Sequence, residues 1–367
     1  MMSTWTTKIA AAGLAVMMMA GLAACEGQVP VAQPETSSTQ TPDLTKAQEK
    51  RIRQNILTVV DKANDDKNTD GLDQRMSGPA LEIRTSEINI AKVTGKLDAK
   101  TAIPTDMTQT VVPTDSGWPR LVYTITTTTE DQQSKRLLVL RQDSARSNYK
   151  LWGVARLFQG AKLPKFAIPD LGAEMGNEND KGLVATPKEA VRRYADVLQN
   201  GASSQYASGF SDDFFRDSLG DLTKTGEEGM KRNNGTQQQV FTPANDAISV
   251  MRSSDGGDLV VARIDSQWTR AAGEGRESQP ASDAEKALFG NGKPTSTMRV
   301  TYVNVVALYI PPAKDKQPIT AVGAEWQPVK VEAVSRIVRS RGPAGRVACV
   351  PVAVPRQGGR RGAPSTC

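Results

Sequence analysis

The chain has 367 residues, with 46 lysines and arginines, 40 aspartates and glutamates, and no histidine. The missing histidine excludes imidazole metal ligands, Ser-His-Asp and Cys-His nucleophile systems, and any histidine acid or base. Seven arginines lie between residues 333 and 367, which leaves 39 basic against 40 acidic residues elsewhere, and no basic cluster stands between residues 45 and 330, so we expect no nucleic-acid partner.

The first 24 residues have the features of an export signal. Lys8 precedes an apolar run over residues 9–24, which is shorter than the roughly 20 residues of a membrane span. The run ends in Leu22-Ala23-Ala24-Cys25, which resembles the lipobox of bacterial lipoproteins. The resemblance implies that the mature chain starts at Cys25 and that acyl chains on this residue hold it at the extracytoplasmic face of the cell membrane. In the alternative, an ordinary secretory signal, Cys25 is incidental.

Residues 25–44 are expected to be a disordered tether after the lipidated cysteine, because they are rich in Pro, Ser, Thr and Gln and have no apolar periodicity. The chain beyond the tether is long enough for two domains. Apart from Cys25, the cysteines are Cys349 and Cys367, so no disulfide framework holds the body.

The first α+β domain is predicted over residues 45–160. Thr45 and Gln48 form a capping box, and apolar residues at helical spacing predict a helix over residues 45–64. A short helical segment follows at 72–81. Alternating Thr, Val, Ile and aromatic residues then predict strands at 87–93, 121–128, 136–142 and 149–158, with a hairpin turn at 143–148.

Residues 161–185 carry scattered Pro and Gly and are interpreted as a connector to a second α+β domain over residues 186–338. Thr186-Pro187 with Glu189 predicts a capped helix that ends at Gly201, and a short helix is expected to begin near Phe210. Strands are predicted at 259–268, 298–310 and 326–338. The strand at 301–310 is apolar on both faces apart from Asn304, which is typical of a central strand covered on both sides.

A long insertion separates Trp268 from Met298 and contains its own capped helix over residues 282–289, which Gly290 closes. Loops of this length are usually functional or disordered. We therefore expect this insertion to be a contact surface.

Residues 45–160 and 186–338 share one order: a capped helix, a second helical segment, and strands that end in a Trp-containing one. This order, together with Phe210-Ser-Asp-Asp-Phe214, resembles the nuclear transport factor two-like fold, an α+β half-cone in which a curved antiparallel sheet wraps a helix. The resemblance implies two tandem half-cone domains. Through Arg75-Met-Ser-Gly-Pro-Ala-Leu-Glu82 the chain also resembles uncharacterised cell-envelope lipoproteins of high-GC Gram-positive bacteria, which implies a cell-surface location and no known reaction.

Three sequence motifs are weak. Asp66-Lys-Asn68-Thr-Asp70-Gly71 matches the first half of a calcium loop, but Ser77 stands where a bidentate Glu is needed, so a polar turn is favoured and no metal is predicted. Ser147 to Lys150 and Lys224-Thr-Gly226 are similar to motifs of penicillin-binding proteins. The first is expected in a turn and the second in a polar loop, whereas that chemistry needs a serine that opens a buried helix.

Half-cone folds often hold an apolar pocket between helix and sheet. Candidate pocket residues are Tyr123, Trp152, Tyr302 and Asn304, for which core packing is the alternative. We expect no cofactor and a non-catalytic binding or assembly module whose partner is an envelope protein or a wall polymer. The alternative is a small-molecule enzyme of the half-cone fold that uses carboxylate and tyrosine groups as acid and base.

Residues 339–367 consist almost entirely of Arg, Gly, Pro, Ala, Val, Ser and Cys and cannot build a core. Two interpretations compete for this basic tail. It is either a disordered cationic arm that binds anionic wall polymers, or translation out of frame from a GC-rich gene.

Overall fold

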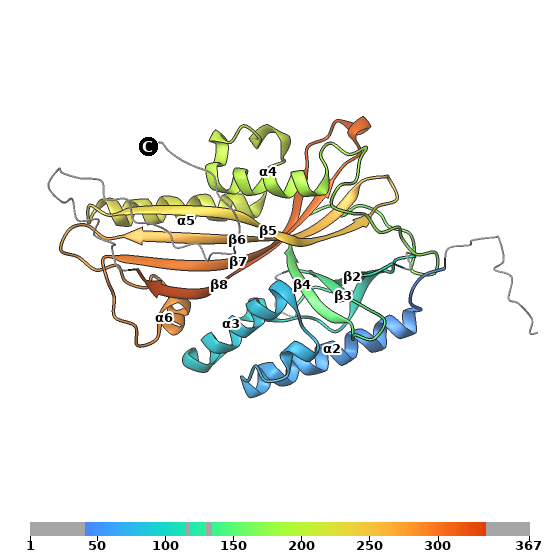
Figure 1. The fold of residues 1–367 in the computed structure, drawn as a ribbon, viewed down its shortest axis with the longest axis horizontal. Coiled ribbons are helices and arrows are strands. Elements are labelled where there is room, and N and C mark those ends of the chain that lie inside the picture. Colours follow the sequence, from blue (N-terminus) through green and yellow to red (C-terminus); the bar gives the residue numbers. More distant parts are fainter. Residues whose placement is uncertain (1–40, 115–116, 130–133, 335–367) are drawn as a thin grey trace, which may run out of the picture.

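The computed structural model describes residues 41–114, 117–129 and 134–334, and of residues 245 and 246 only the backbone. The predicted export signal, most of the tether and the basic tail lie outside the described residues. The fold is α+β: eight antiparallel strands form one continuous sheet in the order β1-β2-β3-β4-β8-β7-β6-β5, with helices on its outer faces (Figure 1).

The first half of the described chain consists of two helices followed by an antiparallel meander. The helices are α2 (Lys46–Asp66) and α3 (Gly78–Thr94), separated by the single turn η1 (Leu72–Gln74). The strands are β1 (Met107–Val111), β2 (Arg120–Thr126), β3 (Arg136–Gln142) and β4 (Lys150–Leu157), each paired with the next.

The second half repeats the order of helices and strands with longer strands. Helices α4 (Pro187–Asn200) and α5 (Phe214–Lys231) come first. The strands are β5 (Thr236–Arg252), β6 (Asp258–Ala271), β7 (Thr297–Ile310) and β8 (Thr320–Ala333), and the short helix α6 (Asp283–Phe289) lies between β6 and β7.

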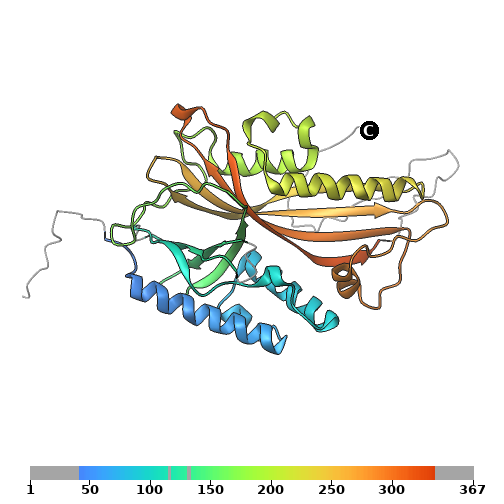
Figure 2. The same cartoon turned by 180° about the vertical axis from the view of Figure 1, so that it is seen from behind.

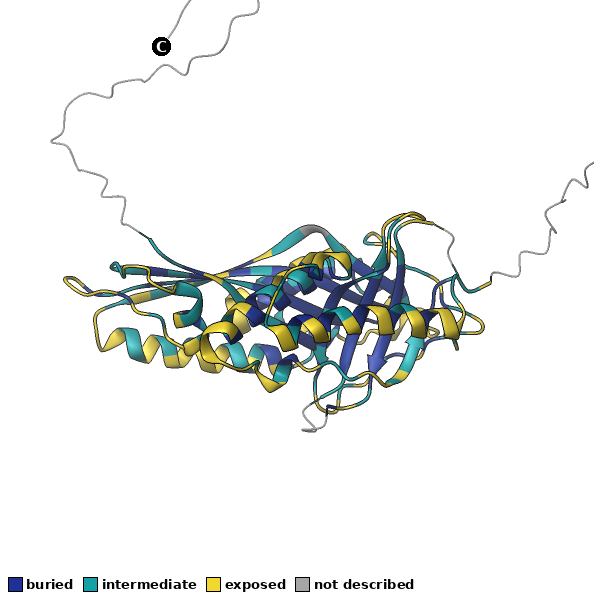
Figure 3. Cartoon of the chain, turned by 90° about the horizontal axis from the view of Figure 1, so that it is seen from below, coloured by how far each residue is buried: buried dark blue, intermediate teal, exposed yellow. Residues whose placement is uncertain are grey.

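The two half-sheets face each other across a shared core, and the helices cover the outside. One cluster of buried side chains joins the inner faces of both half-sheets, including Tyr123, Val139, Val261 and Val305. A second packs α2 and α3 on the outer face of β2–β4, and a third packs α4 and the start of α5 on β5–β8. The result is a helix, sheet, sheet, helix arrangement, seen from both sides in Figures 1 and 2, with buried strands beneath helices whose outer sides are exposed (Figure 3).

The half-sheets are also joined edge to edge, through two residue pairs between β4 and β8: Arg156 with Ala324, and Leu157 with Gly323. Gly323 is required there, because a Cβ at this position would stand 2.6 Å from the carbonyl oxygen of Arg156. Beyond this joint α3 runs along β8, where Ser86 donates to the carbonyl oxygen of Pro328 at 2.6 Å.

Three predicted helix starts, those capped by Thr45, Thr186 and Ser282, are confirmed. The Thr45 hydroxyl accepts from the Gln48 amide at 3.2 Å while the Gln48 side chain accepts from the Thr45 amide at 2.8 Å, which completes the capping box. Thr186 caps α4, and Ser282 caps α6, which ends at Gly290. The strands predicted at 121–128, 136–142, 149–158, 259–268 and 298–310 are also present, and β7 is buried on both faces.

Four predictions of local structure were wrong, and two strands were not predicted. Residues 87–93 form the end of α3, not a strand, because the buried residues Ala80, Ile83, Glu87 and Ala91 follow the helical period of 3.6. The helix after Phe210 is long: α5 has 18 residues and contains Lys224-Thr-Gly226, which was expected in a loop. Strand β8 starts at Thr320, before the predicted residue 326. The short strand β1 and the Gln-rich strand β5 were not predicted.

Candidate functional site

Helix α5 stands partly away from the face of β5–β8 on which it lies, and this creates a cavity. Asp213 caps the helix, and its hydrophobic residues recur at Phe215, Leu219 and Leu222. Phe215 is fully buried and stacks on Trp326 with ring centroids 4.9 Å apart, whereas Leu222, two turns further on, remains 39% exposed. The apolar stripe of α5 therefore leaves the sheet surface uncovered at its far end.

The inner part of this space is a cavity of about 170 Å³, bounded by α5, α6 and the sheet. We call it the α5–α6 cavity. Side chains from seven described segments line it: Lys100, Leu219, Leu222, Gln239, Ser266, Gln267, Trp268, Ser282, Ala284, Tyr302, Asn304, Trp326 and Pro328. The strand residues among them mostly occupy alternate positions, since side chains two apart on a strand share a face.

Asn304 is the most deeply placed polar group of the cavity. Its Nδ2 atom donates to the carbonyl oxygen of Ile264 at 2.7 Å and to the hydroxyl of Ser266 at 3.0 Å, and the residue is 2% exposed. Among the described residues its Oδ1 atom has no hydrogen-bond partner. The side chain is thus held by two donated bonds and offers an acceptor to a ligand.

Two hydrogen bonds through the side chain of Gln237 connect Trp268 to α5. Its indole nitrogen donates to Oε1 of Gln237 at 2.8 Å, and Nε2 of Gln237 donates to the carbonyl oxygen of Thr223 at 2.7 Å. Gly226 permits this approach, since a Cβ there would stand 2.4 Å from Oε1 of Gln237 and 3.1 Å from the Trp268 ring. The guanidinium of Arg270 lies 4.4 Å from the centroid of the Trp268 ring.

Helix α6 closes the cavity through a buried ion pair. Arg270 donates to both carboxylate oxygens of Glu285, and the two side chains are 5% and 3% exposed. The backbone amide of Ala281 also donates to Glu285, at 2.7 Å. Both oxygens of this carboxylate are therefore occupied, and the fork of Arg270 fixes the position of α6.

Tyr302 lies between this ion pair and the cavity. Burial, followed by the nearby charge of Glu285, raises the pKa of Tyr302 above its usual value. The phenol is therefore neutral at physiological pH and can donate or accept a hydrogen bond, but it is not a ready source of phenolate.

A wider groove of about 940 Å³ continues outward from Trp268 and Leu222. It lies between the second half of α5 and residues 272–281, and Arg276, Glu277 and Asn233 supply polar groups at its rim. Arg276 donates to Oδ1 of Asn233 at 2.6 Å, so the two sides of the groove are joined. The cavity and the groove together form a site large enough for an extended ligand.

Of the four candidate residues from the sequence, two line the cavity and two do not. Tyr302 and Asn304 lie side by side on β7 and face it. Tyr123 and Trp152 belong to the core between the half-sheets, with the indole of Trp152 packed beneath Gly78 at the start of α3. Burial raises the pKa of Tyr123.

Sequence reasoning missed the lining residues Trp268, Trp326, Gln239 and Lys100. The alternation in β6 placed Trp268 on the same face as Ile264, which was a usable signal. Lys100 had none, since it reaches the site from the first half of the chain and donates to Gln327 at 3.1 Å.

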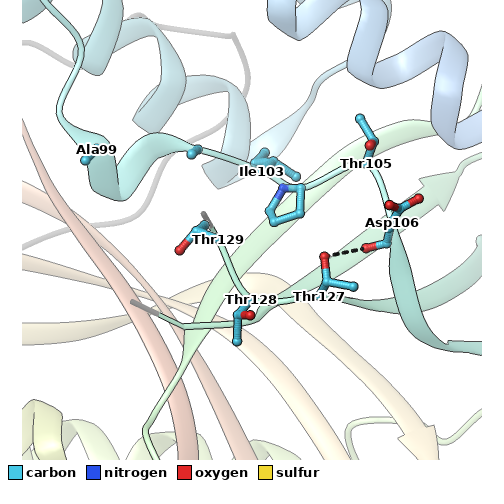
Figure 4. A pocket seen from close by; sticks show the side chains of 9 residues that line it. Ala99, Ile103, Thr105, Asp106, Thr127, Thr128 and Thr129 are labelled. Carbon is cyan, nitrogen blue, oxygen red and sulfur yellow. Dashed lines mark hydrogen bonds between the residues drawn. The ribbon is translucent and has the colours of Figure 1, made fainter. Parts of the chain in front are cut away.

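Another groove, of about 560 Å³, lies between the segment that leads into β1 and the end of β2 (Figure 4). Threonines dominate its lining, with Asp106 as its carboxylate, and Thr127 donates to the Asp106 carbonyl oxygen at 3.4 Å. Its described lining residues include no aromatic side chain and no pair of titratable groups, so we do not take it as the functional site.

The weak motifs occupy structural positions. Residues 66–71 form the turn after α2, in which Asn68 donates to Asp70 at 3.0 Å. Ser147 lies in the turn between β3 and β4 and donates to the carbonyl oxygen of Ser144 at 2.9 Å. Within the part of the chain that the structure describes, no group of three or more Cys, Asp or Glu side chains is arranged to hold a metal ion.

The fold and site define an α+β protein with a helix-covered cavity on a long antiparallel sheet. Residues 40–328 match the family described as Domain of unknown function (DUF8094), and the chain belongs to that family. No curated protein and no solved structure matches the chain. Among the described residues, no helix has the length and apolar character needed to cross a bilayer.

Proposed function

We propose that this protein is a membrane-anchored lipoprotein of the cell envelope that binds a ligand in the α5–α6 cavity without transforming it. The observation that carries the proposal is the cavity itself, where two indoles and several neutral hydrogen-bonding groups converge while the adjacent carboxylate, Glu285, is paired with Arg270. That combination suits recognition better than proton transfer.

The anchoring part of the proposal is supported by the sequence. Leu22-Ala23-Ala24-Cys25 follows an apolar run and precedes a Pro- and Ser-rich stretch. Cys25 would carry the acyl chains, and the described body would lie at the extracytoplasmic face.

The finer fold proposal is that the body consists of two half-cone domains that arose by duplication. Each half has two α-helices followed by four antiparallel strands, with α6 inserted between β6 and β7 in the second half, and the two leading helices cover the outer face. The strand order is also symmetric, because β4 and β8, the last strand of each half, meet at the centre of the sheet.

The state of Glu285 favours binding over catalysis. A general base needs a carboxylate with a free lone pair in reach of its substrate. Three donated bonds, two from Arg270 and one from the Ala281 amide, occupy most of the lone pairs of the Glu285 carboxylate and leave little of it for a substrate.

The ligand class that fits the lining is a neutral or weakly anionic saccharide, such as a unit of a wall polymer. Aromatic rings offer apolar faces, and Asn304, Gln239, Ser266 and Tyr302 offer donors and acceptors without a net charge, while Lys100 supplies one cation. A cavity of about 170 Å³ holds roughly one sugar ring, and the outer groove would accept the continuation of the polymer.

The binding test uses the chain from residue 26 to residue 367 and soluble peptidoglycan fragments released by muramidase digestion. We expect saturable binding by calorimetry, weakened about tenfold or more in Asn304→Ala and Trp268→Phe, because a hydrogen-bonded or stacked group typically contributes about 1–2 kcal/mol. Trp118→Phe, outside the cavity, is the matched control. Binding that is absent, or that both cavity variants leave unchanged, would refute the site.

The anchoring test is independent of the ligand. Cys25→Ala should leave the precursor unprocessed or release the protein from the membrane fraction, whereas Cys349→Ala should not. Detergent partitioning that is the same for Cys25→Ala and the unaltered chain would contradict the anchor.

One observation favours the alternative of an acid-base enzyme: Tyr302 lies against Glu285 at the cavity wall. Turnover of a saccharide by the purified chain, abolished in Glu285→Gln and in Tyr302→Phe, would replace the binding proposal with this one.

A further inference from the structure

Three large apolar side chains are exposed around the point where the described chain begins. Trp118 is 43% exposed, Ile168 is 59% exposed and Leu171 is 67% exposed. We call them the apolar end patch. Figures 1 and 2 both show the start of α2 and the connector loop at the same end of the molecule.

Pro42 and Asp43, which lie just before α2, contact the segments on both sides that carry the patch residues. Asp43 donates its amide to the carbonyl oxygen of Pro113 at 2.8 Å, and its carboxylate lies 3.5 Å from Arg120. The guanidinium of Arg120 lies 4.7 Å from the centroid of the Trp118 ring. On the other side, a methyl group placed on Gly172 would stand 3.4 Å from Cγ of Pro42.

Ile168 and Leu171 project from a tight turn. The amides of Leu171 and Gly172 both donate to the carbonyl oxygen of Ile168, at 2.9 and 3.0 Å, and Gly172 has a φ of 73° that favours glycine. Asp170, between the two apolar residues, pairs with Lys46 at the start of α2 at 2.6 Å. The turn is therefore fixed to the body and presents two large aliphatic side chains to solvent.

Two ion pairs within the chain flank the patch. Lys46 is paired with Asp170, and Arg120 lies against Asp43. The patch therefore offers apolar surface, with a tryptophan at its margin and two internally paired ionic contacts beside it.

We propose that the apolar end patch rests on the lipid surface to which Cys25 is anchored. The inference depends on the proposed anchoring for its biological setting. Sixteen residue steps separate Cys25 from Thr41 and reach at most about 55 Å, so the end that carries the patch is the one an anchored Cys25 holds nearest to the bilayer. Tryptophan at the membrane interface and aliphatic side chains at the acyl boundary suit that position.

Contact with the bilayer also orients the site. The α5–α6 cavity lies beside α6, where β5–β8 are furthest from the start of α2 (Figure 1). The patch lies at the opposite end of the molecule, around the start of α2. A body resting on the patch would direct the cavity away from the lipid, toward the polymers outside it.

The test does not depend on natural acylation, because the chain is attached to lipid by a chemical coupling. Residues 25–367 with Cys349→Ser and Cys367→Ser are coupled through the Cys25 thiol to maleimide lipid in phosphatidylcholine vesicles that contain nitroxide-labelled lipid. The described contacts lie within residues 41–334, so this chain retains every element of the described fold. The measurement is quenching of tryptophan emission by the nitroxide.

We expect quenching of the coupled chain above that of uncoupled chain mixed with the same vesicles. Trp118→Phe should abolish this excess, and Trp268→Phe should retain it. Ile168→Ser with Leu171→Ser should reduce it by at least about half, whereas the matched pair Val93→Ser with Val240→Ser, two exposed apolar residues elsewhere, should not.

Excess quenching that is absent, that survives Trp118→Phe, or that the control pair lowers as much as the patch pair would overturn the inference. Because the anchor is synthetic, such a result says nothing against acylation of Cys25. Conversely, if Cys25→Ala failed to release the native protein from the membrane fraction, the quenching measured with the synthetic anchor would still stand.

Discussion

At the scale of single residues, the most unusual group lies outside the cavity. Asp258, the first residue of β6, is fully buried, and among the described residues neither of its carboxylate oxygens has a hydrogen-bond partner. Its nearest cation, Arg252, lies 3.7 Å away but bonds to Asp180 at 2.6 Å. Burial raises the pKa of Asp258 to about 7, Arg252 opposes the shift, and the charge of Asp180 adds to it.

This raised pKa predicts that stability falls as the pH rises. The folded state binds the proton of Asp258 more tightly than the unfolded state does, so the stabilisation is complete below the unfolded pKa and is lost as the pH rises through about 7. Between pH 5 and pH 8 the free energy of unfolding should fall by roughly 3 kcal/mol through this group.

Denaturant unfolding at both pH values measures the effect. Asp258→Asn should remove most of this fall, because the amide carries no charge to bury, while the exposed Asp73→Asn should keep it. An Asp258→Asn variant with the full pH dependence of the unaltered chain would contradict the assignment.

At the scale of elements, the position of α6 depends on one ion pair more than on its own helix propensity. The helix has seven residues, too few to be stable alone, and Glu285 is its buried member. Leu288 and Phe289 add apolar contacts to Met298 and Val300. The wall of the cavity should therefore loosen when Glu285 loses its charge.

Glu285→Gln leaves the buried Arg270 without a counter-charge, and breaking such a pair typically costs about 3–5 kcal/mol. Because the loss falls on a short helix, we expect local opening: cleavage between residues 272 and 296 by a dilute protease should accelerate, and saccharide binding should weaken. Lys286→Ala is the matched control, since the pair of Lys286 with Asp283 is exposed. Equal cleavage rates in the two variants would argue against the role of the pair.

At the scale of the whole molecule, the shared core should make the two halves unfold together. Leu259, Val261 and Val305 of the second half pack in the same buried cluster as Tyr123 and Val139 of the first. If one half unfolded alone, the apolar surface of the other half would be exposed to water. The free-energy cost of that exposure disfavours an intermediate with a single folded half.

Leu259→Ala is predicted to destabilise both halves by about 2–5 kcal/mol, as expected for truncation of a fully buried leucine. Unfolding followed by variants that retain only Trp152 or only Trp326 reports the first and the second half separately, and the two transitions should shift together. Val93→Ala, on an exposed helix position, should shift neither. A shift confined to the second half would indicate independent domains.

The sequence by itself determined the local features. Thr45, Thr186 and Ser282 predicted three helix starts correctly, because an N-cap side chain accepts a hydrogen bond from the first turn of the helix that it caps. Alternation predicted most strands, and the apolar run of β7 correctly predicted burial on both faces. At residues 87–93 the alternating pattern of a strand competed with the 3.6-residue period of a helix, and the strand prediction was wrong. The helix α3 forms there because it is stabilised by packing on β4 and β8.

The tertiary structure alone decided how the elements combine. Tyr302 and Asn304 became cavity residues, whereas Tyr123 and Trp152, equally aromatic or polar on strand faces, became core residues, because the two half-sheets cover each other's inner faces. The joining of β4 to β8 and the arrival of Lys100 in the site depend on contacts between residues more than 150 positions apart. Such contacts depend on the shape and burial of distant partners, which no local pattern in a single sequence specifies.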